Sequence, residues 1–79
     1  MTTKVNQPET ETGKRRKICQ TFFMLPAPVD AEAFWQQLKS DGMDVSLGLV
    51  HNTLTLLTDY GFAERSRDEQ TRVSYFRPL

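Results

Sequence analysis

Apolar residues recur along the chain first at helical spacing and then, near the C-terminus, in alternation. The first helical segment places them at i, i+4 and i+7, with a cysteine beside the stripe: Ile18, Cys19, Phe22 and Leu25. This spacing predicts a helix that begins at Gly13. The helix should end before Pro26, because a proline disfavours helical dihedral angles in the residue ahead of it.

A second helix is predicted after the stiff connector of residues 26–28. Asp30 is a good N-cap, since its carboxylate can accept a hydrogen bond from a free N–H group of the first turn. An apolar stripe at i, i+3, i+4 and i+7 follows, made of Ala31, Phe34, Trp35 and Leu38. Asp41 and Gly42 end this helix, which should pack by one face.

The third helical segment is the most informative part of the chain. Residues 43–45 read as a turn, Ser46 as the N-cap and Gly61 as the glycine stop, with Tyr60 closing the core. At 100° per residue, the face expected to be buried comprises Leu47, Val50, Leu54 and Leu57, flanked by Leu49 and Leu56. The opposite arc is polar and comprises Gly48, His51, Asn52, Thr55 and Asp59. No Lys or Arg lies between Ser46 and Phe62.

Two short alternating segments complete the pattern. Residues 62–67 and 72–77 are predicted to be strands around a loop of residues 68–71. A two-stranded hairpin is not stable alone, so it should lie on the helices. The predicted fold is α+β and mainly α: a winged helix-turn-helix, with three helices followed by a two-stranded β-hairpin wing.

The length of 79 residues suits one domain. Residues 1–12 are polar and lack periodicity, so we expect a disordered tail there and the winged-helix domain over residues 13–79. The start lacks the apolar core of a secretory signal, and no apolar run approaches the roughly 20 residues of a membrane span. We therefore expect a cytoplasmic protein with no membrane partner.

Ten basic and ten acidic residues cancel, but their distribution is uneven. Residues 14–17 are four adjacent cations, and residues 18–61 hold one base, Lys39, against five acids. The C-terminal segment is again positive, through Arg65, Arg67, Arg72 and Arg77.

One cysteine and one histidine are too few for an ordinary zinc site, so we expect no metal and no other cofactor. Cys19 is best interpreted as a small buried apolar residue.

The sequence from Asp30 onward reads D-A-E-A-F-W-Q-Q-L-K-S-D-G, then M-D-V-S-L, then V-x-x-T-L-x-L-L-x-x-Y-G-F. This order resembles the DNA-binding domain of the ferric uptake regulator (Fur) family. That family typically reads A-E-E-L-Y-x-x-L-K, then S-L-A-T-V-Y-R-T-L-x-L-L-x-x-A-G-L-V, then a wing ending near R-Y-E. The resemblance spans roughly residues 15–76, with Tyr75 at the wing tyrosine. It implies a transcription regulator, or a fragment of one, that binds DNA.

The chain departs from the family pattern at its contact residues. The family sequence A-T-V-Y-R corresponds to G-L-V-H-N at residues 48–52, so four of these five positions differ. The loop histidine that often helps to bind regulatory metal in the family falls near Pro28. The resemblance ends before the His- and Cys-rich dimerisation domain of the family, because the sequence ends at Leu79. We therefore expect no iron sensing.

Three segments hold the candidate DNA-contacting residues. The predicted phosphate contacts are Lys14, Arg15, Arg16 and Lys17 in the basic run and Arg65, Arg67 and Arg72 in the wing. The predicted groove contacts are Leu49, His51, Asn52 and Thr55. Simpler interpretations exist: a solubilising basic tail, a solvated polar helix face, and wing arginines paired with Glu64, Asp68 and Glu69. The expected partner is double-stranded DNA, bound weakly by one domain, with a homodimer or a protein partner adding affinity.

The alternative function belongs to a different class. The winged helix can have lost DNA binding and become a protein–protein interaction module that uses its third helix and exposed Leu49, Trp35 or Phe76. The acidic middle of the chain and the missing family arginine favour this alternative. Trp35 and the Phe22–Phe23 pair are more simply explained as packing residues. No catalytic triad, paired-carboxylate cleft or phosphate-binding glycine loop occurs, so we do not expect an enzyme.

Overall fold

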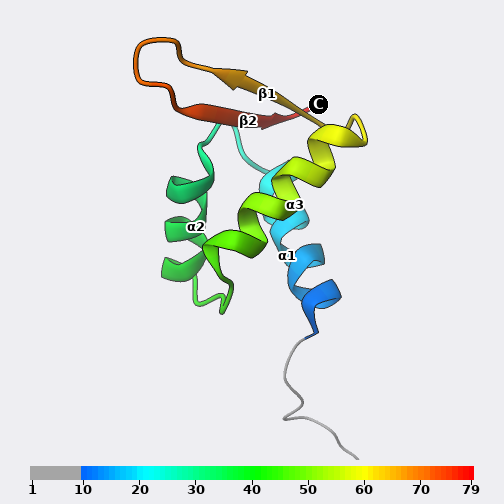
Figure 1. Cartoon of the computed structure of the whole chain (residues 1–79). Coiled ribbons are helices and arrows are strands. Elements are labelled where there is room, and N and C mark those ends of the chain that lie inside the picture. Colours follow the sequence, from blue (N-terminus) through cyan, green and yellow to red (C-terminus); the bar gives the residue numbers. More distant parts are fainter. Residues whose placement is uncertain (1–9) are drawn as a thin grey trace, which may run out of the picture.

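The computed structural model describes residues 10–79, and residues 1–9 of the predicted tail lie outside this part. The elements are α1 (Glu11–Phe23), α2 (Ala31–Ser40), α3 (Leu47–Asp59), β1 (Ala63–Arg67) and β2 (Ser74–Pro78). The β1–β2 hairpin covers one end of the three helices (Figure 1). The predicted architecture, a mainly helical α+β winged helix, is therefore confirmed.

Side-chain caps determine where each helix begins. Thr10, Asp30 and Ser46 each have extended backbone, and each side chain accepts a hydrogen bond of 2.8–3.1 Å from the N–H group three residues later. The caps at Asp30 and Ser46 confirm the prediction. Helix α1 begins at Glu11, earlier than the predicted Gly13, because Thr10 supplies the cap.

Helix α3 ends at the predicted glycine. Gly61 has a φ of 84°, in the left-handed region that favours glycine, and the N–H of Phe62 donates to the carbonyl of Leu57 at 2.8 Å. This bond uses a carbonyl that has no partner within the helix. The chain therefore turns sharply from α3 into β1.

The hairpin strands pair antiparallel, with Ala63 opposite Pro78 and Arg67 opposite Ser74. The other edge of β2 pairs with the α1–α2 connector, where Val29 exchanges backbone hydrogen bonds of 2.9 and 2.7 Å with Phe76. The sequence pattern did not predict this bridge. It ties the connector to the sheet, as Figure 1 shows.

One hydrophobic core joins all three helices and the hairpin. It consists of Ile18, Phe22, Phe34, Leu38, Val45, Val50, Leu54, Ala63 and Phe76. Trp35 is half-buried, and its indole N–H donates to the carbonyl of Val45 at 2.8 Å. The predicted use of Phe76 as an exposed contact for a protein partner is wrong, because Phe76 is 1% exposed beneath the sheet.

Two further predictions about α3 are wrong. Leu47 is 38% exposed rather than buried, and Tyr60 is 72% exposed rather than closing the core. The buried arc is rotated toward Thr53, which is buried and donates its hydroxyl to the carbonyl of Leu49 at 2.7 Å. Leu47 lies at the opposite flank of that arc. Tyr60 is the C-cap, and its dihedral angles (φ −88°, ψ 0°) no longer continue those of the helix.

Candidate nucleic-acid interface

The basic run occupies the first turns of α1, as predicted. Lys14 and Arg15 are half-buried, whereas Arg16 and Lys17 are exposed. Helix α1 projects from the body of the domain with this end foremost (Figure 1). The run therefore presents positive charge at the end of the domain opposite the sheet.

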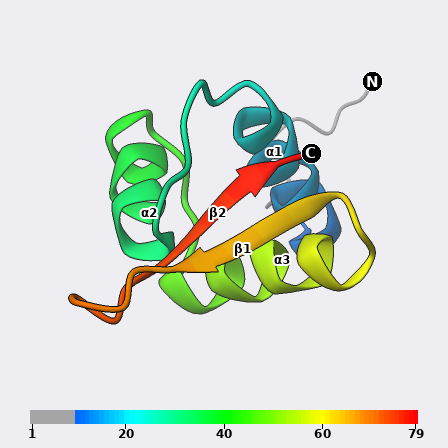
Figure 2. The same cartoon turned by 90° about the horizontal axis from the view of Figure 1, so that it is seen from above.

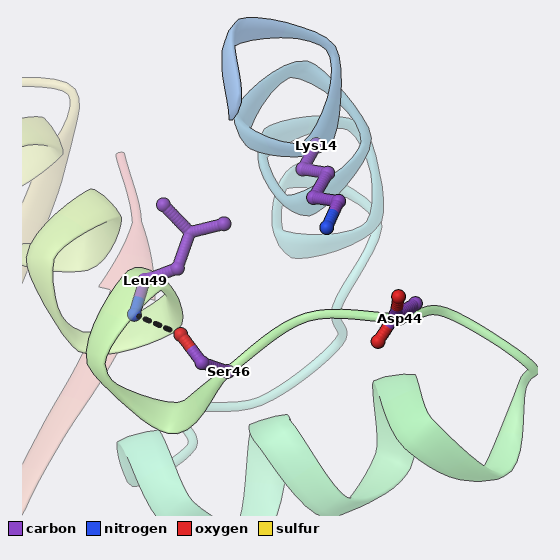
Figure 3. Close-up of a pocket in the computed structure, with 4 residues that line it drawn as sticks. All are labelled: Lys14, Asp44, Ser46 and Leu49. Carbon is purple, nitrogen blue, oxygen red and sulfur yellow. Dashed lines mark hydrogen bonds between the residues drawn. The ribbon is translucent and has the colours of Figure 1, made fainter. Parts of the chain in front are cut away.

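A surface cavity of about 270 Å³ joins the basic run to the start of α3. Lys14, Asp44, Ser46 and Leu49 line it. The Lys14 side chain extends from α1 toward the loop that carries Asp44 and Ser46, and Leu49 points toward α1 (Figure 3). The first cation of the run and the first turn of α3 thus share one surface, which includes the acidic group of Asp44.

The exposed face of α3 is smaller than predicted. His51 and Asn52 are exposed, but Leu49 and Thr55 are half-buried. The Thr55 hydroxyl oxygen is enclosed and has no hydrogen-bond partner among the described residues. The His51 ring meets Phe76 edge-on, with centroids 6.4 Å apart and an interplanar angle of 88°. Of the four predicted groove-contact residues, only His51 and Asn52 are therefore fully exposed.

The three wing arginines are all exposed. Arg67 and Arg72 line an open cavity of about 290 Å³ at the hairpin loop, together with Glu69. The predicted cross-strand pairs of these arginines do not form within residues 10–79. Glu64 instead accepts from the Arg77 Nε at 2.7 Å. The positive charge of Arg65, Arg67 and Arg72 is therefore not neutralised by direct pairing in this part of the chain.

The hairpin loop is ordered by Asp68. Its carboxylate accepts backbone hydrogen bonds from Thr71 at 3.1 Å and Gln70 at 2.8 Å. These bonds to Thr71 and then Gln70 lower the pKa of the Asp68 carboxyl below its ordinary value. Arg72 closes the loop with a φ of 66°, an uncommon conformation for a residue with a Cβ.

The candidate contact segments surround α3 without forming one cluster. The start of α1 and the hairpin loop lie at opposite ends of the domain, with α3 between them (Figure 1). Seen from above, β1 runs over α3 and the loop projects beyond the helices (Figure 2). Lys14 is brought beside Leu49, whereas the wing arginines form a separate group. The sequence had predicted Ser46 only as a cap and had not indicated Asp44 at this surface.

Within residues 10–79, no group of three or more His, Cys, Asp or Glu side chains is arranged to hold an ion. Cys19 is half-buried, and burial raises the pKa of its thiol, against a smaller lowering by the Arg15 charge. The thiol is thus not activated by its neighbours.

No helix of this part of the chain is long and apolar enough to cross a membrane.

The fold of this chain is similar to that of several solved regulators. The zinc uptake regulator FurB of M. tuberculosis matches with a TM-score of 0.82 at 22% identity, covering 87% of this chain and 53% of FurB. The ferric uptake regulator of Vibrio cholerae matches with a TM-score of 0.75 at 25% identity, covering 84% of this chain and 50% of that protein. PerR of Streptococcus pyogenes matches with a TM-score of 0.74 at 23% identity, covering 94% of this chain and 49% of PerR.

These comparisons confirm the resemblance to the Fur-family DNA-binding domain. The chain spans about half the length of each of these regulators. The matched proteins are regulators rather than enzymes. No protein-family model matches the sequence, and no curated protein matches it.

Proposed function

We propose that this chain binds double-stranded DNA as a winged-helix module of a transcription regulator. One observation carries the proposal: Lys14 of the basic run lines the same surface cavity as Ser46 and Leu49, at the start of α3. A recognition helix enters the major groove by its N-terminal residues, so cations beside that end are close to the flanking phosphates. The similarity to Fur-type regulators supports the same assignment.

Positive charge on both sides of α3 would supply most of the affinity. The basic run would contact phosphates on one side of the groove, and Arg65, Arg67 and Arg72 would contact them on the other. Each neutralised phosphate releases counterions, which makes binding weaken as salt is added. The neutral net charge of the chain and the acidic group of Asp44 predict modest affinity.

Sequence readout would come from few side chains. Asn52 is exposed and can pair with an adenine edge, and His51 can donate to a base or a phosphate. Leu49 can contact a thymine methyl from the cavity side. Thr55 belongs to the predicted set, but its enclosed hydroxyl makes it the weakest member. We therefore expect low discrimination between DNA sequences.

A salt titration tests the proposal. The 79-residue chain is titrated into fluorescent mixed-sequence duplexes, and binding is measured by anisotropy from 50 to 200 mM salt. We expect binding that weakens steeply over this range. Folded protein that shows no salt-sensitive binding near 50 mM would contradict the proposal.

Matched variants locate the contacts. Arg16→Gln removes an exposed cation of the basic run, and Arg67→Gln removes one from the wing. Each should lower the magnitude of the slope of log K against log salt by about 0.9, the value for one phosphate contact. Lys39→Gln, which removes an exposed cation of α2, is the control and should leave the slope unchanged.

A protein–protein interaction module is the second candidate function. It is favoured by the absence of cations on α3 and by the exposed apolar residues of this helix, Leu47 and Leu56. A protein partner would bind with little salt dependence and would be insensitive to Arg16→Gln. The same titration therefore separates the two functions.

A cytoplasmic location remains a prediction of the sequence.

A further inference from the structure

Strand β1 has an outer edge that no other strand within residues 10–79 covers. Its inner edge pairs with β2, and the bridge to Val29 lies on the far side of β2. In the view from above, β2 lies on one side of β1 and no labelled strand lies on the other (Figure 2). The backbone groups along such an edge can pair with another extended chain.

The bridge at Phe76 determines which backbone groups of β1 point outward. In an antiparallel pair, residues that bond to the partner strand alternate with residues whose N–H and C=O groups point away from it. Phe76 directs both of its groups to Val29, at 2.9 and 2.7 Å, and therefore away from β1. Arg65 lies opposite Phe76 in the register. The N–H and C=O groups of Arg65 thus point away from β2, toward the outer edge.

The hairpin loop gives the same alternation independently. The N–H of Asp68 donates across the hairpin to the carbonyl of Val73 at 2.9 Å. Since Asp68 bonds inward, Ser66 two residues earlier does so too, and the backbone groups of Arg67 between them point outward. The outer edge of β1 therefore presents the N–H and C=O groups of Arg65 and Arg67, both exposed residues.

The same two residues give this edge positive charge. The side chains of Arg65 and Arg67 lie on one face of the sheet, because the residues are two apart in a strand. Neither guanidinium forms an ion pair within residues 10–79. The only acidic residue of β1, Glu64, is paired with Arg77. Outward backbone groups and two unpaired cations thus coincide at two positions.

We propose that the outer edge of β1 binds an acidic peptide as an added β-strand. The peptide would form backbone hydrogen bonds with Arg65 and Arg67, as in other cases of strand addition to a sheet edge. Acidic residues at alternate peptide positions would lie beside both guanidiniums, and such cross-strand pairs of opposite charge stabilise a sheet. A second copy of β1 would place arginine against arginine, which is unfavourable. The guanidiniums are shared with the proposed phosphate contacts, so bound peptide and DNA would exclude each other.

Amide hydrogen exchange of the isotope-labelled full chain tests this inference without DNA, and so independently of the proposed function. The probe is a peptide with blocked ends that alternates valine with aspartate. At about ten times its Kd, exchange at the amides of Arg65 and Arg67 should slow about tenfold, since only the free chain exchanges. The amides of Glu64 and Ser66 already bond to β2 and should change little. No slowing at Arg65 and Arg67 with up to about 1 mM peptide would overturn the inference.

Two altered peptides separate backbone pairing from charge. The residues opposite Arg65 and Arg67 would share their face and exchange hydrogen bonds with them. Methylation of the aspartate backbone nitrogens removes those N–H groups and keeps the charge, whereas lysine in place of aspartate keeps the backbone and reverses the charge. We expect each change to weaken binding at least tenfold. Unchanged binding of the methylated peptide would exclude strand addition, unchanged binding of the lysine peptide would exclude charge recognition, and either result would overturn the inference.

Charge reversal in the chain locates the bound peptide. Arg65→Glu/Arg67→Glu should lose binding of the aspartate peptide and gain binding of the lysine peptide. Lys39→Glu, which reverses an exposed cation of α2, is the control and should leave binding of the aspartate peptide unchanged. Because these residues are exposed, the circular dichroism spectra of both variants should remain those of the wild type. A double variant that binds the aspartate peptide as tightly as the wild type would place the site elsewhere and overturn the inference.

Discussion

The two ends of α3 differ in the surface that surrounds them. At the start of the helix, Ser46 and Leu49 share a cavity with the cation of Lys14 and the carboxylate of Asp44. Just beyond its end, Tyr60 and Phe62 are 72% and 57% exposed. The surface at one end of the helix therefore carries charged groups, whereas the other end exposes large side chains without charge. The difference shows that the two ends of α3 must be described separately, as well as its buried and exposed faces.

The largest loss of stability should come from a substitution in the middle of α3, which supports both ends of the helix. Leu54 is fully buried in the middle of α3. Leu54→Ala should lower the free energy of unfolding by about 2–5 kcal/mol, because it removes buried methyl groups and leaves a cavity. Urea denaturation followed by circular dichroism measures the change. An unchanged free energy of unfolding would contradict the role of Leu54 in the core.

The C-terminal end can be perturbed alone through Gly61. An added Cβ would meet no atom within 4 Å, so only the left-handed φ of 84° opposes a side chain there. Gly61→Ala should lower the free energy of unfolding by about 1–2 kcal/mol, the cost of that conformation for an L-residue.

Gly48 is the matched control for Gly61. It lies inside α3, where an added Cβ would meet only the Ser46 Oγ at 4.0 Å. Gly48→Ala should raise the free energy of unfolding by about 0.5–1 kcal/mol, because alanine loses less backbone entropy in a helix. Thermal denaturation of both variants gives the comparison. A stabilising Gly61→Ala would show that the turn does not require its left-handed conformation.

The N-terminal end can be perturbed through its cap. The Ser46 hydroxyl accepts a hydrogen bond from the N–H of Leu49 at 3.1 Å. Ser46→Ala should destabilise the domain by about 1 kcal/mol and increase fraying of the first turn. Amide hydrogen exchange should accelerate at Leu49 but not at Tyr60. Equal acceleration of exchange at both amides would contradict a local role for this cap.

The smallest effect on stability is expected away from α3, in the hairpin loop that contains Asp68. The pKa of Asp68 is lowered in the folded chain, so its contribution to stability is present above its unfolded pKa and is lost as the pH falls through its folded pKa. The amide proton signals of Thr71 and Gln70 should report this titration by NMR below about pH 4. Asp68→Asn removes the titration and is the control. Unchanged amide signals in the wild type would contradict a role for this carboxylate in loop order.

The sequence predicted the elements of this fold because the signals that define them are local. The caps at Asp30 and Ser46 and the stop at Gly61 act on the nearest turn, and they lie where expected. Apolar periodicity identified the central core positions Phe34, Val50 and Leu54. The resemblance to the Fur-family domain followed from the same skeleton.

Long-range packing decided what the local pattern left open. The bridge between Val29 and Phe76 joins segments far apart in the sequence, and it buries a residue expected to be exposed. The buried arc of α3 depends on how α1, α2 and the hairpin meet it, which is why Leu47 is exposed and Thr53 is buried.

The sequence alone thus determined the three helices, the limits of α2 and α3, the hairpin and the position of the basic run, because neighbouring residues set these features. The tertiary structure decided which side chains reach the surface of α3, that Lys14 shares the cavity with Ser46, and that Phe76 is buried beside its bridge to Val29. Those juxtapositions arise when separate elements bury a common core. No spacing within a single element could have specified them.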